Sequence, residues 1–499
     1  MMTTRETCRR CASGRRIPRR QFLVTATASV GFPMIMARGQ KPKNKPLASL
    51  TCRMDRIVDD TDREVLLRGM NAGSWFMLEP WICGIGLPLK SHARALAREC
   101  DAEDALNVAL SRIGPFDDDT TRLADYLDRL GEAVARTGQG PGPGRFRERL
   151  KTEPPLLDAL SLDRLFRKRF GEDGVAAFWE TFHRCWITPE DLRAARSVGF
   201  NFIRLPFWYR WLESDDAPGA WLESGFRMLE SAVAMAAEAG LYVLLDLHGA
   251  PGGQSMWDHT GEAGRNAFFG DAACQARAAA LWRVVAERFR NEPAVAGYDL
   301  LNEPAGARDL ETWTLAHDQM YRAIRAVDPS RPIIMEDGYK LEEPRHAVKG
   351  WFPMPDARDW QNVVYSVHFY KTGSFEAHEK QARLMTSLAE REGRQCRVPM
   401  YIGEFNAIED TPDALRAMTY YGRIFSDAGI HWSPWTLKYC GEDARQTLWG
   451  LIRSREPWEP VQPYRDDLDA ILTKVRRYAE ASRFQVHEGY AKALAEGCS

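Results

Sequence analysis

The sequence predicts a (β/α)8 TIM barrel, and the prediction rests on the order and composition of its apolar runs. From about residue 51 onward, eight short β-rich runs alternate with amphipathic stretches. Nearly all of these runs are continuously apolar, which is typical of parallel strands buried on both faces. Such strands, separated by helices, indicate a closed α/β barrel. In order, the expected strands are VLLRGMN (65–71), FNFIRLPF (200–207), YVLLDLHG (242–249), VAGYDLLNEP (295–304), PIIMEDG (332–338), VVYSVHFY (363–370), VPMYIGEFN (398–406) and IHWSPWTLKY (430–439).

The stretches between these runs have the spacing of helices. In SGFRMLESAVAMAAEAG and AACQARAAALWRVVAERFR, apolar residues recur every three or four positions. The first stretch ends in Gly240, a common stop at a helix C-terminus. After residue 462, DDLDAILTKVRRYAEAS predicts a last helix that packs on the outside of the barrel.

One segment departs from this alternation. Residues 88–178 contain charge-rich helical sequence and the loop GQGPGPG at 138–144. The segment is too long for an ordinary connection, so we expect a helical insertion after the first strand. It could be a lid on the active-site rim or surface decoration, and the sequence leaves both roles open. We expect one catalytic domain over residues 48–499, which includes this insertion.

The N-terminus has the features of a twin-arginine export signal. A basic region leads into Arg19-Arg20-Gln21-Phe22-Leu23 and a weakly apolar stretch that ends in small residues. We therefore predict a signal peptide over residues 1–37 and a periplasmic or extracellular protein. A disordered basic tail and a misassigned start codon are the alternatives. No other apolar run in the sequence approaches the ~20 residues of a membrane helix.

The charge and the cysteines restrict the possible ligands. Without residues 1–37, which carry seven Arg and one Glu, 60 basic and 68 acidic residues give a net charge of −8. An acidic protein without a basic stripe argues against nucleic acid and anionic membranes as partners, and it suits a neutral ligand. The ten cysteines are scattered, although export would permit one or two disulfides. With no HExxH motif or His/Cys cluster, we expect no metal. We also expect no cofactor and a monomeric protein.

Two acidic residues end apolar runs that we expect to be strands. Glu303 lies in YDLLNEP and Glu404 in YIGEF, about 100 residues apart. A buried carboxylate is costly unless it is paired or used in chemistry. Retaining glycosidases need an ionised nucleophile and a protonated acid with carboxyl groups about 5–5.5 Å apart. Neighbouring barrel strands can supply both groups if their environments separate the two pKa values. The pair therefore suggests cleavage of a glycosidic bond.

Polar residues at other strand ends could support this pair. Arg204 and Tyr370 could donate hydrogen bonds that keep Glu404 charged. The amide of Asn302, directly before Glu303, could hold a sugar hydroxyl. Each residue also has a structural explanation, because Asn-Glu-Pro suits a plain strand-to-helix turn and Arg204 could pair with a barrel carboxylate. Their occurrence together, at the ends of successive strands, favours the functional interpretation.

Two histidines and a tryptophan complete the candidate site. His248 and His368 lie at strand ends, where neutral imidazoles can hydrogen-bond sugar hydroxyls. Trp435 could form a flat apolar floor, because sugar rings expose C–H faces that pack on aromatic rings. Taken singly, such histidines are more often structural and such a tryptophan is more often part of the core.

In chain order, these residues resemble the signature of glycoside hydrolase family 5: Arg204, His248, Asn302, Glu303, His368, Tyr370, Glu404 and Trp435. The resemblance covers roughly residues 63–83 and 178–440. It implies that Glu303 is the acid/base and Glu404 the nucleophile, and that the other six residues bind the sugar being cleaved. The motifs RGMNAGSWFMLEPWI and LDLHGAPGGQSMWDHTG are most similar to the exo-β-1,3-glucanase branch. By that analogy, Glu79 and the loop from Gly249 to Gly261 would shape the cleft.

The leading hypothesis is an exported retaining β-glycosidase that acts on a β-glucan or β-glucoside. The chain departs from the exo-β-1,3-glucanase branch at Phe405, after the expected nucleophile, and at Leu437, where an aromatic residue is usual. The same machinery could therefore act on mannan, a glycolipid or a diglycoside. A carbohydrate-binding barrel without catalysis is a third hypothesis, which the two intact carboxylates disfavour.

Overall fold

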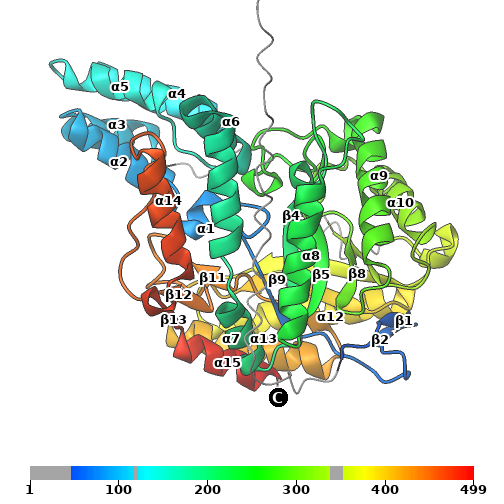
Figure 1. Ribbon diagram of the computed structural model, residues 1–499. Coiled ribbons are helices and arrows are strands. Elements are labelled where there is room, and N and C mark those ends of the chain that lie inside the picture. The colour runs from blue at the N-terminus through cyan, green and yellow to red at the C-terminus, as the bar shows by residue number, and fades with distance from the viewer. Residues whose placement is uncertain (1–45, 117–121, 338–351, 499) are drawn as a thin grey trace, which may run out of the picture. The chain divides into compact units, whose positions relative to one another are not determined.

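The computed structural model describes residues 46–116, 122–337 and 352–498. Its centre is one sheet of eight parallel strands in the order β10-β9-β8-β7-β6-β5-β4-β3, so the predicted (β/α)8 barrel is confirmed (Figure 1). A parallel bridge between Arg68 and Trp432 joins its two outer strands. The strands are β3 (Gly69–Asn71), β4 (Phe202–Trp208), β5 (Tyr242–Gly249), β6 (Val295–Asp299), β7 (Ile333–Glu336), β8 (Val363–Tyr370), β9 (Met400–Asn406) and β10 (His431–Trp432).

The last expected strand, residues 430–439, is wrong as a single strand. Only β10 belongs to the barrel, whereas β11 (Lys438–Tyr439) forms a separate sheet with β12 (Ile452–Ser454) and β13 (Phe484–Val486). Pro434 lies between the two pieces and has no N–H to continue the barrel ladder. The apolar run therefore leaves the barrel here and carries Trp435 over its C-terminal end.

A short N-terminal hairpin closes the other end of the barrel. Its strands β1 (Thr51–Arg53) and β2 (Arg56–Val58) pair antiparallel. Leu50 and Ile57 pack in one apolar cluster with residues from the beginnings of the barrel strands, which are Phe202, Tyr242, Ala296, Ile334, Val364 and Tyr401. Because this end is filled with apolar side chains, polar chemistry is left to the C-terminal ends of the strands.

Helices follow the strands and cover the barrel (Figure 1). Those beside the barrel are α7 (Pro189–Val198), α8 (Glu223–Glu238), α9 (Ala272–Phe289), α10 (Leu310–Arg325), α12 (Phe375–Cys396), α13 (Pro412–Asp427) and α15 (Glu488–Cys498). Helix α15 packs closely on α13, since a Cβ on Gly422 would lie 2.7 Å from the Cα of Gly497. The expected last helix is α14 (Leu468–Arg476), which packs beside α6 (Ala159–Cys185) (Figure 1).

The segment expected as an insertion contains α2 (Leu89–Glu99), α3 (Glu103–Ile113), α4 (Leu123–Thr137), α5 (Gly142–Thr152) and the first part of α6. It follows the short helix α1 (Pro80–Cys83). Helices α2 to α5 bury their apolar faces against one another in a cluster separate from the main core, which includes Leu96, Leu106, Leu130 and Phe146. This part of the chain therefore has a small core of its own.

Three expectations concern parts of the chain other than the barrel. The predicted signal peptide, residues 1–37, lies outside the described residues. Within the described part, each of the eight cysteines has a free thiol, so no disulfide links them. Among the described helices, none combines the length and the apolar character needed to cross a membrane.

A buried ion pair joins α7 to β11, and removing one of its partners should destabilise the protein. Lys438 Nζ lies 3.0 Å from Asp191 Oδ2, and both side chains are at most 9% exposed. Asp191 also completes the capping box of α7. Lys438→Met should lower the free energy of unfolding by about 3–5 kcal/mol, because it leaves a buried carboxylate without its cation. Urea unfolding measures this change.

An exposed ion pair provides the control for this experiment. Arg53 and Asp62 are paired with side chains 64% and 76% exposed. Because solvent screens such a pair, Arg53→Met should lower the free energy of unfolding by less than about 1 kcal/mol. Equal losses in the two variants would contradict the assignment of a structural role to the Lys438–Asp191 pair.

Candidate active site

The structure brings all eight predicted site residues together at the C-terminal end of the barrel. Arg204 lies in β4, His248 in β5, His368 and Tyr370 in β8, and Glu404 in β9. Asn302 and Glu303 directly follow β6, and Trp435 follows β10. Arg204 is fully buried, and its guanidinium donates to Glu404 Oε1 at 2.7 Å and to Asn302 Oδ1 at 2.8 Å. It thereby links two neighbouring parts of the site.

Three further acids surround the same guanidinium, and the sequence prediction missed them. Asp246 Oδ2, Asp299 Oδ2 and Glu336 Oε1 lie 3.0, 2.8 and 2.6 Å from Arg204 nitrogens. All three are fully buried. Each interrupts an apolar strand run, in YVLLDLHG, VAGYDLL and PIIMED. The cost of burying an acid, which pointed to Glu303 and Glu404, could have identified these residues too.

The pKa values of the three buried acids shift in different directions. Burial raises the pKa of Asp246 to about 8 against the charge of Arg204, and it raises the pKa of Asp299 well above its ordinary value. For Glu336 burial also opposes ionisation, but the charges of His368 and Arg204 outweigh it and lower the pKa. Of the three acids, Glu336 is therefore the one whose surroundings favour the charged form. Although the three acids are spaced closely enough to surround a metal ion, Arg204 already supplies the positive charge between them.

Glu303 is held in an unusual backbone conformation at the end of β6. Its φ is +40°, in the left-handed region that residues other than glycine seldom adopt. Its backbone N–H donates to Glu336 Oε2 at 2.8 Å. Its Oε1 lies 3.0 Å from His368 Nδ1, and its Oε2 lies 3.5 Å from His259 Nε2. The carboxyl group is thus directed toward two histidines.

The charge state of Glu303 depends on His368. Burial opposes ionisation of Glu303, but the hydrogen bond from His368 and the charges of His259 and His368 bring its pKa down to about 2. Burial alone would lower the pKa of His368, whereas Glu336 and Glu404 raise it well above its ordinary value. In the Glu303–His368 pair, both shifts favour the proton on the histidine. The sequence had suggested a proton on Glu303 itself.

Glu404 has a donor on each of its oxygens. Arg204 donates to Oε1, and the hydroxyl of Tyr370 donates to Oε2 at 2.6 Å. Burial raises the pKa of Glu404 from its ordinary value, with His368 and Arg204 opposing that rise. One oxygen of Glu404 and one of Glu303 lie within 4.8 Å of each other. The two carboxyl groups therefore face one another across a narrow gap.

The remaining predicted residues form a polar and aromatic wall. The rings of His248 and Trp435 stack with centroids 5.5 Å apart, and His248 Nδ1 lies 2.7 Å from Asp246 Oδ2. Burial lowers the pKa of His248 to about 4, so its ring is neutral near pH 7. Asn302 donates to His259 Nδ1 at 3.0 Å, which fixes the amide orientation. His259 was not singled out from the sequence, although its loop was expected to shape the cleft.

Aromatic rings extend from Glu404 toward the rim of the site. Tyr370 packs against Trp449, which in turn contacts Trp81 edge to face. Trp81 Nε1 donates to Glu79 Oε2 at 3.0 Å, whereas Glu79 Oε1 has no hydrogen-bond partner in the described structure. Burial, together with the charge of Asp258, raises the pKa of Glu79 well above its ordinary value. Glu79 thus presents a free oxygen close to the two central carboxylates.

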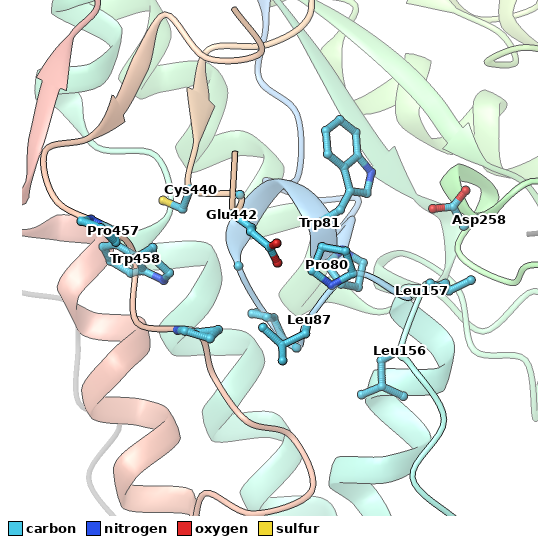
Figure 2. Close-up of a pocket in the computed structure, with 16 residues that line it drawn as sticks. Pro80, Trp81, Leu87, Leu156, Leu157, Asp258, Cys440, Glu442, Pro457 and Trp458 are labelled. Carbon is cyan, nitrogen blue, oxygen red and sulfur yellow. The ribbon is translucent and has the colours of Figure 1, made fainter. Parts of the chain in front are cut away.

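An apolar pocket of about 200 Å³ lies where the barrel meets the inserted helices. Trp81, Leu87, Leu156, Leu157 and Trp458 contribute apolar lining, and Asp258 and Glu442 are its carboxylates. Figure 2 shows the side chain of Glu442 between Trp458 and Pro80. Because Trp81 belongs to both the pocket and the aromatic row, the pocket borders the candidate site.

Comparisons with known proteins agree with this geometry. Residues 167–441 match the family model described as cellulase, glycosyl hydrolase family 5. A beta-xylosidase of Phanerodontia chrysosporium is 28% identical over 341 residues, which cover 63% of this chain and 69% of that protein. A probable glucan 1,3-beta-glucosidase A of Neosartorya fischeri is 32% identical over 320 residues, or 62% of this chain. The chain spans only 57% of the length of that relative.

Solved structures support the fold. A crystal structure of an endogalactoceramidase superimposes with a TM-score of 0.52, covering 90% of this chain and 85% of that one. The two sequences are 19% identical.

Proposed function

The chain belongs to glycosyl hydrolase family 5, and from this premise we propose that it is an exported retaining β-glycosidase that hydrolyses β-glucosidic bonds of a glucan or glucoside. Membership makes it an O-glycosyl hydrolase. The preference for glucosides is supported by the glucan 1,3-beta-glucosidases among its relatives and by its RGMNAGSWFMLEPWI motif. The proposal of export is supported by the twin-arginine pattern at residues 19–23.

The observation that carries the retaining mechanism is the separation of the two carboxylates. Retaining glycosidases have carboxyl groups about 5–5.5 Å apart, whereas inverting enzymes leave about 6.5–9.5 Å for a water molecule. One oxygen of Glu303 lies within 4.8 Å of one oxygen of Glu404, which supports the first arrangement. The hydrogen bonds of Glu404 to Arg204 and Tyr370 suit a nucleophile that must carry negative charge.

The reaction proceeds in two displacements. An oxygen of Glu404 bonds to the anomeric carbon while the bond from that carbon to the leaving oxygen breaks. The proton held by the Glu303–His368 pair passes through Glu303 to the leaving oxygen. Glu303 then takes a proton from water, the water oxygen bonds to the anomeric carbon, and the bond to Glu404 breaks. Two inversions at one carbon retain its configuration.

Trapping the covalent intermediate tests this proposal. A 2-fluoro-β-glucoside with a good leaving group should inactivate the enzyme, because the fluorine slows the second displacement more than the first. Peptide mass mapping should place one fluoroglucosyl group on Glu404. A label on another residue, or a product of inverted configuration seen by NMR, would contradict the mechanism.

A β-glycoside that carries an apolar group, such as a glycolipid, is a second candidate substrate. The apolar pocket beside Trp81 favours it, because that lining offers little to sugar hydroxyls. Rates on glucosides with alkyl chains of increasing length, compared with laminari- and gluco-oligosaccharides, separate the two candidates. A rise in kcat/KM with chain length would favour the apolar substrate, and faster cleavage of oligosaccharides would favour the glucan.

A further inference from the structure

Glu336 is a buried acid that contacts three groups of the candidate site. It ends β7, and its side chain is completely buried. Its Oε1 lies 2.6 Å from an Arg204 nitrogen and 3.5 Å from His368 Nε2, and its Oε2 accepts the backbone N–H of Glu303 at 2.8 Å. Its own carbonyl accepts from Trp313 Nε1, which fixes the end of the strand. Three groups of the site thus face this carboxylate with N–H donors or a cation, and the carboxyl groups of Asp246 and Asp299 lie beside it.

Given the glycosidase function proposed above, we propose that Glu336 is a positioning residue that fixes both the backbone of the acid/base Glu303 and the proton on its partner His368. One oxygen holds the peptide nitrogen of Glu303, and the other faces the two cations of the site. The residue acts through these neighbours and does not contact the anomeric carbon.

The backbone contact has a direct structural consequence. Glu303 has a φ of +40°, in the left-handed region that is strained for an L-residue with a side chain. A charged oxygen 2.8 Å from its N–H favours this conformation over the relaxed one. Because the φ angle of Glu303 directs its side chain toward His368, losing the contact would move the acid away from the leaving oxygen. A displacement of about 1 Å can lower a rate by about 10²-fold.

The charge of Glu336 has a second consequence, which concerns the proton. His368 is faced by Glu303 from the loop after β6, by Glu336 from β7 and by Glu404 from β9, while Asp246 on β5 also acts on its charge. Of these, Glu303 and Glu404 change during the reaction, since one gives up a proton and the other forms a bond. Glu336 takes no part in bond making or proton transfer, so its charge favours the imidazolium whenever the Glu303–His368 pair holds its proton.

A glutamine in place of Glu336 would have nearly the same shape but would carry no charge and have only one acceptor oxygen. It offers one acceptor oxygen to three donors, and its amide group would face Arg204 or the Glu303 N–H with like polarity. An aspartate keeps the charge and both acceptor oxygens but is one methylene shorter. The two variants therefore separate the effect of charge from the effect of reach.

The test measures the pH dependence of kcat/KM for 4-nitrophenyl β-glucoside, which reports on ionisations of the free enzyme. In Glu336→Gln, kcat should fall about 10²-fold with KM changed less than about threefold. Its alkaline limb should move about one pH unit toward acid, because the carboxylate that raises the pKa of His368 is gone. In Glu336→Asp, kcat should also fall, but the alkaline limb should stay within about 0.3 pH unit of the wild type.

Asp299→Asn is the matched control. Asp299 also binds Arg204, through Nε at 2.8 Å, but it makes no ion pair with His368 and does not bind the Glu303 N–H. Its substitution should lower activity without moving the alkaline limb. An equal shift in Asp299→Asn would overturn the proposal, and so would a wild-type pH profile in Glu336→Gln.

A measurement on the histidine itself does not depend on turnover. With 15N-labelled histidine, the ring signals of His368, identified by their loss in His368→Asn, should be those of an imidazolium at pH 7. In Glu336→Gln the ring should lose its proton at lower pH. A neutral His368 ring in the wild type overturns the proposal even if the glutamine variant does not fold. If the wild type hydrolyses no glycoside, the glycosidase proposal fails, while the ring titration still decides the role of Glu336.

Discussion

Glu404→Gln should abolish hydrolysis, lowering kcat/KM for aryl β-glucosides by about 10⁴-fold or more. The amide cannot bond to the anomeric carbon, so the first displacement has no nucleophile. Arg204 and Tyr370 each donate to a different oxygen of Glu404, so in the amide one of them would face an NH2 group, which does not accept. Initial rates on 4-nitrophenyl β-glucoside measure the loss.

A smaller substitution at the same position adds a chemical test. In Glu404→Gly, azide should enter the space of the missing carboxylate and attack in its place, giving an α-glucosyl azide and restoring part of the rate. Glu409→Gln is the control, because Glu409 lies just beyond β9 and binds the Gly373 N–H on the outside of the site. It should keep its activity within about threefold. Azide product of β configuration from Glu404→Gly would assign the nucleophile elsewhere.

Glu303→Ala should affect substrates according to their leaving groups. Hydrolysis of alkyl glucosides and oligosaccharides should fall about 10²–10⁴-fold, because their leaving oxygen must be protonated. A 2,4-dinitrophenyl glucoside needs no acid, so its first displacement should remain fast and the glucosyl-enzyme should accumulate as a burst. Azide should accelerate its turnover and give a β-glucosyl azide.

The pH profile gives a second result for this variant. In the wild type, the alkaline limb of kcat/KM reports loss of the proton shared by Glu303 and His368. Without the carboxylate, His368 cannot pass that proton to the leaving oxygen, so the limb should disappear for the dinitrophenyl substrate. An equal loss of rate on all leaving groups, with the limb retained, would show that Glu303 is not the acid.

The barrel was predictable from the sequence because parallel strands buried on both faces leave unmistakable apolar runs. VVYSVHFY and YVLLDLHG match their strands residue for residue. The boundary near Pro434 was not predictable, since Trp435 and Leu437 continue the apolar run although they pack over the barrel end. An apolar run that is buried by tertiary contacts has the same sequence pattern as a buried strand.

The sequence predicted part of the site, including Arg204 and His368 inside their strands, but it missed Glu336, which ends β7. Glu303 and Glu404 were singled out, whereas Asp246 and Asp299, which also interrupt apolar runs, were missed. Only the structure shows that both of them pair with Arg204. The location of the acid's proton was also beyond the sequence. The position of the proton depends on three carboxylates that surround His368. They come from different parts of the chain, and the spacing of residues in the sequence does not predict that they lie close together.

The arrangement around Arg204 limits how this protein can evolve. Four acids and two amides share the guanidinium of Arg204. Substitution of Arg204 would therefore leave several buried polar groups without their partner at once. A lysine, with three donors from a single point, could not replace the planar fork. Descendants of this chain should therefore keep the arginine and its acids together or exchange them as a set, and a lineage that lost one would be expected to lose the others.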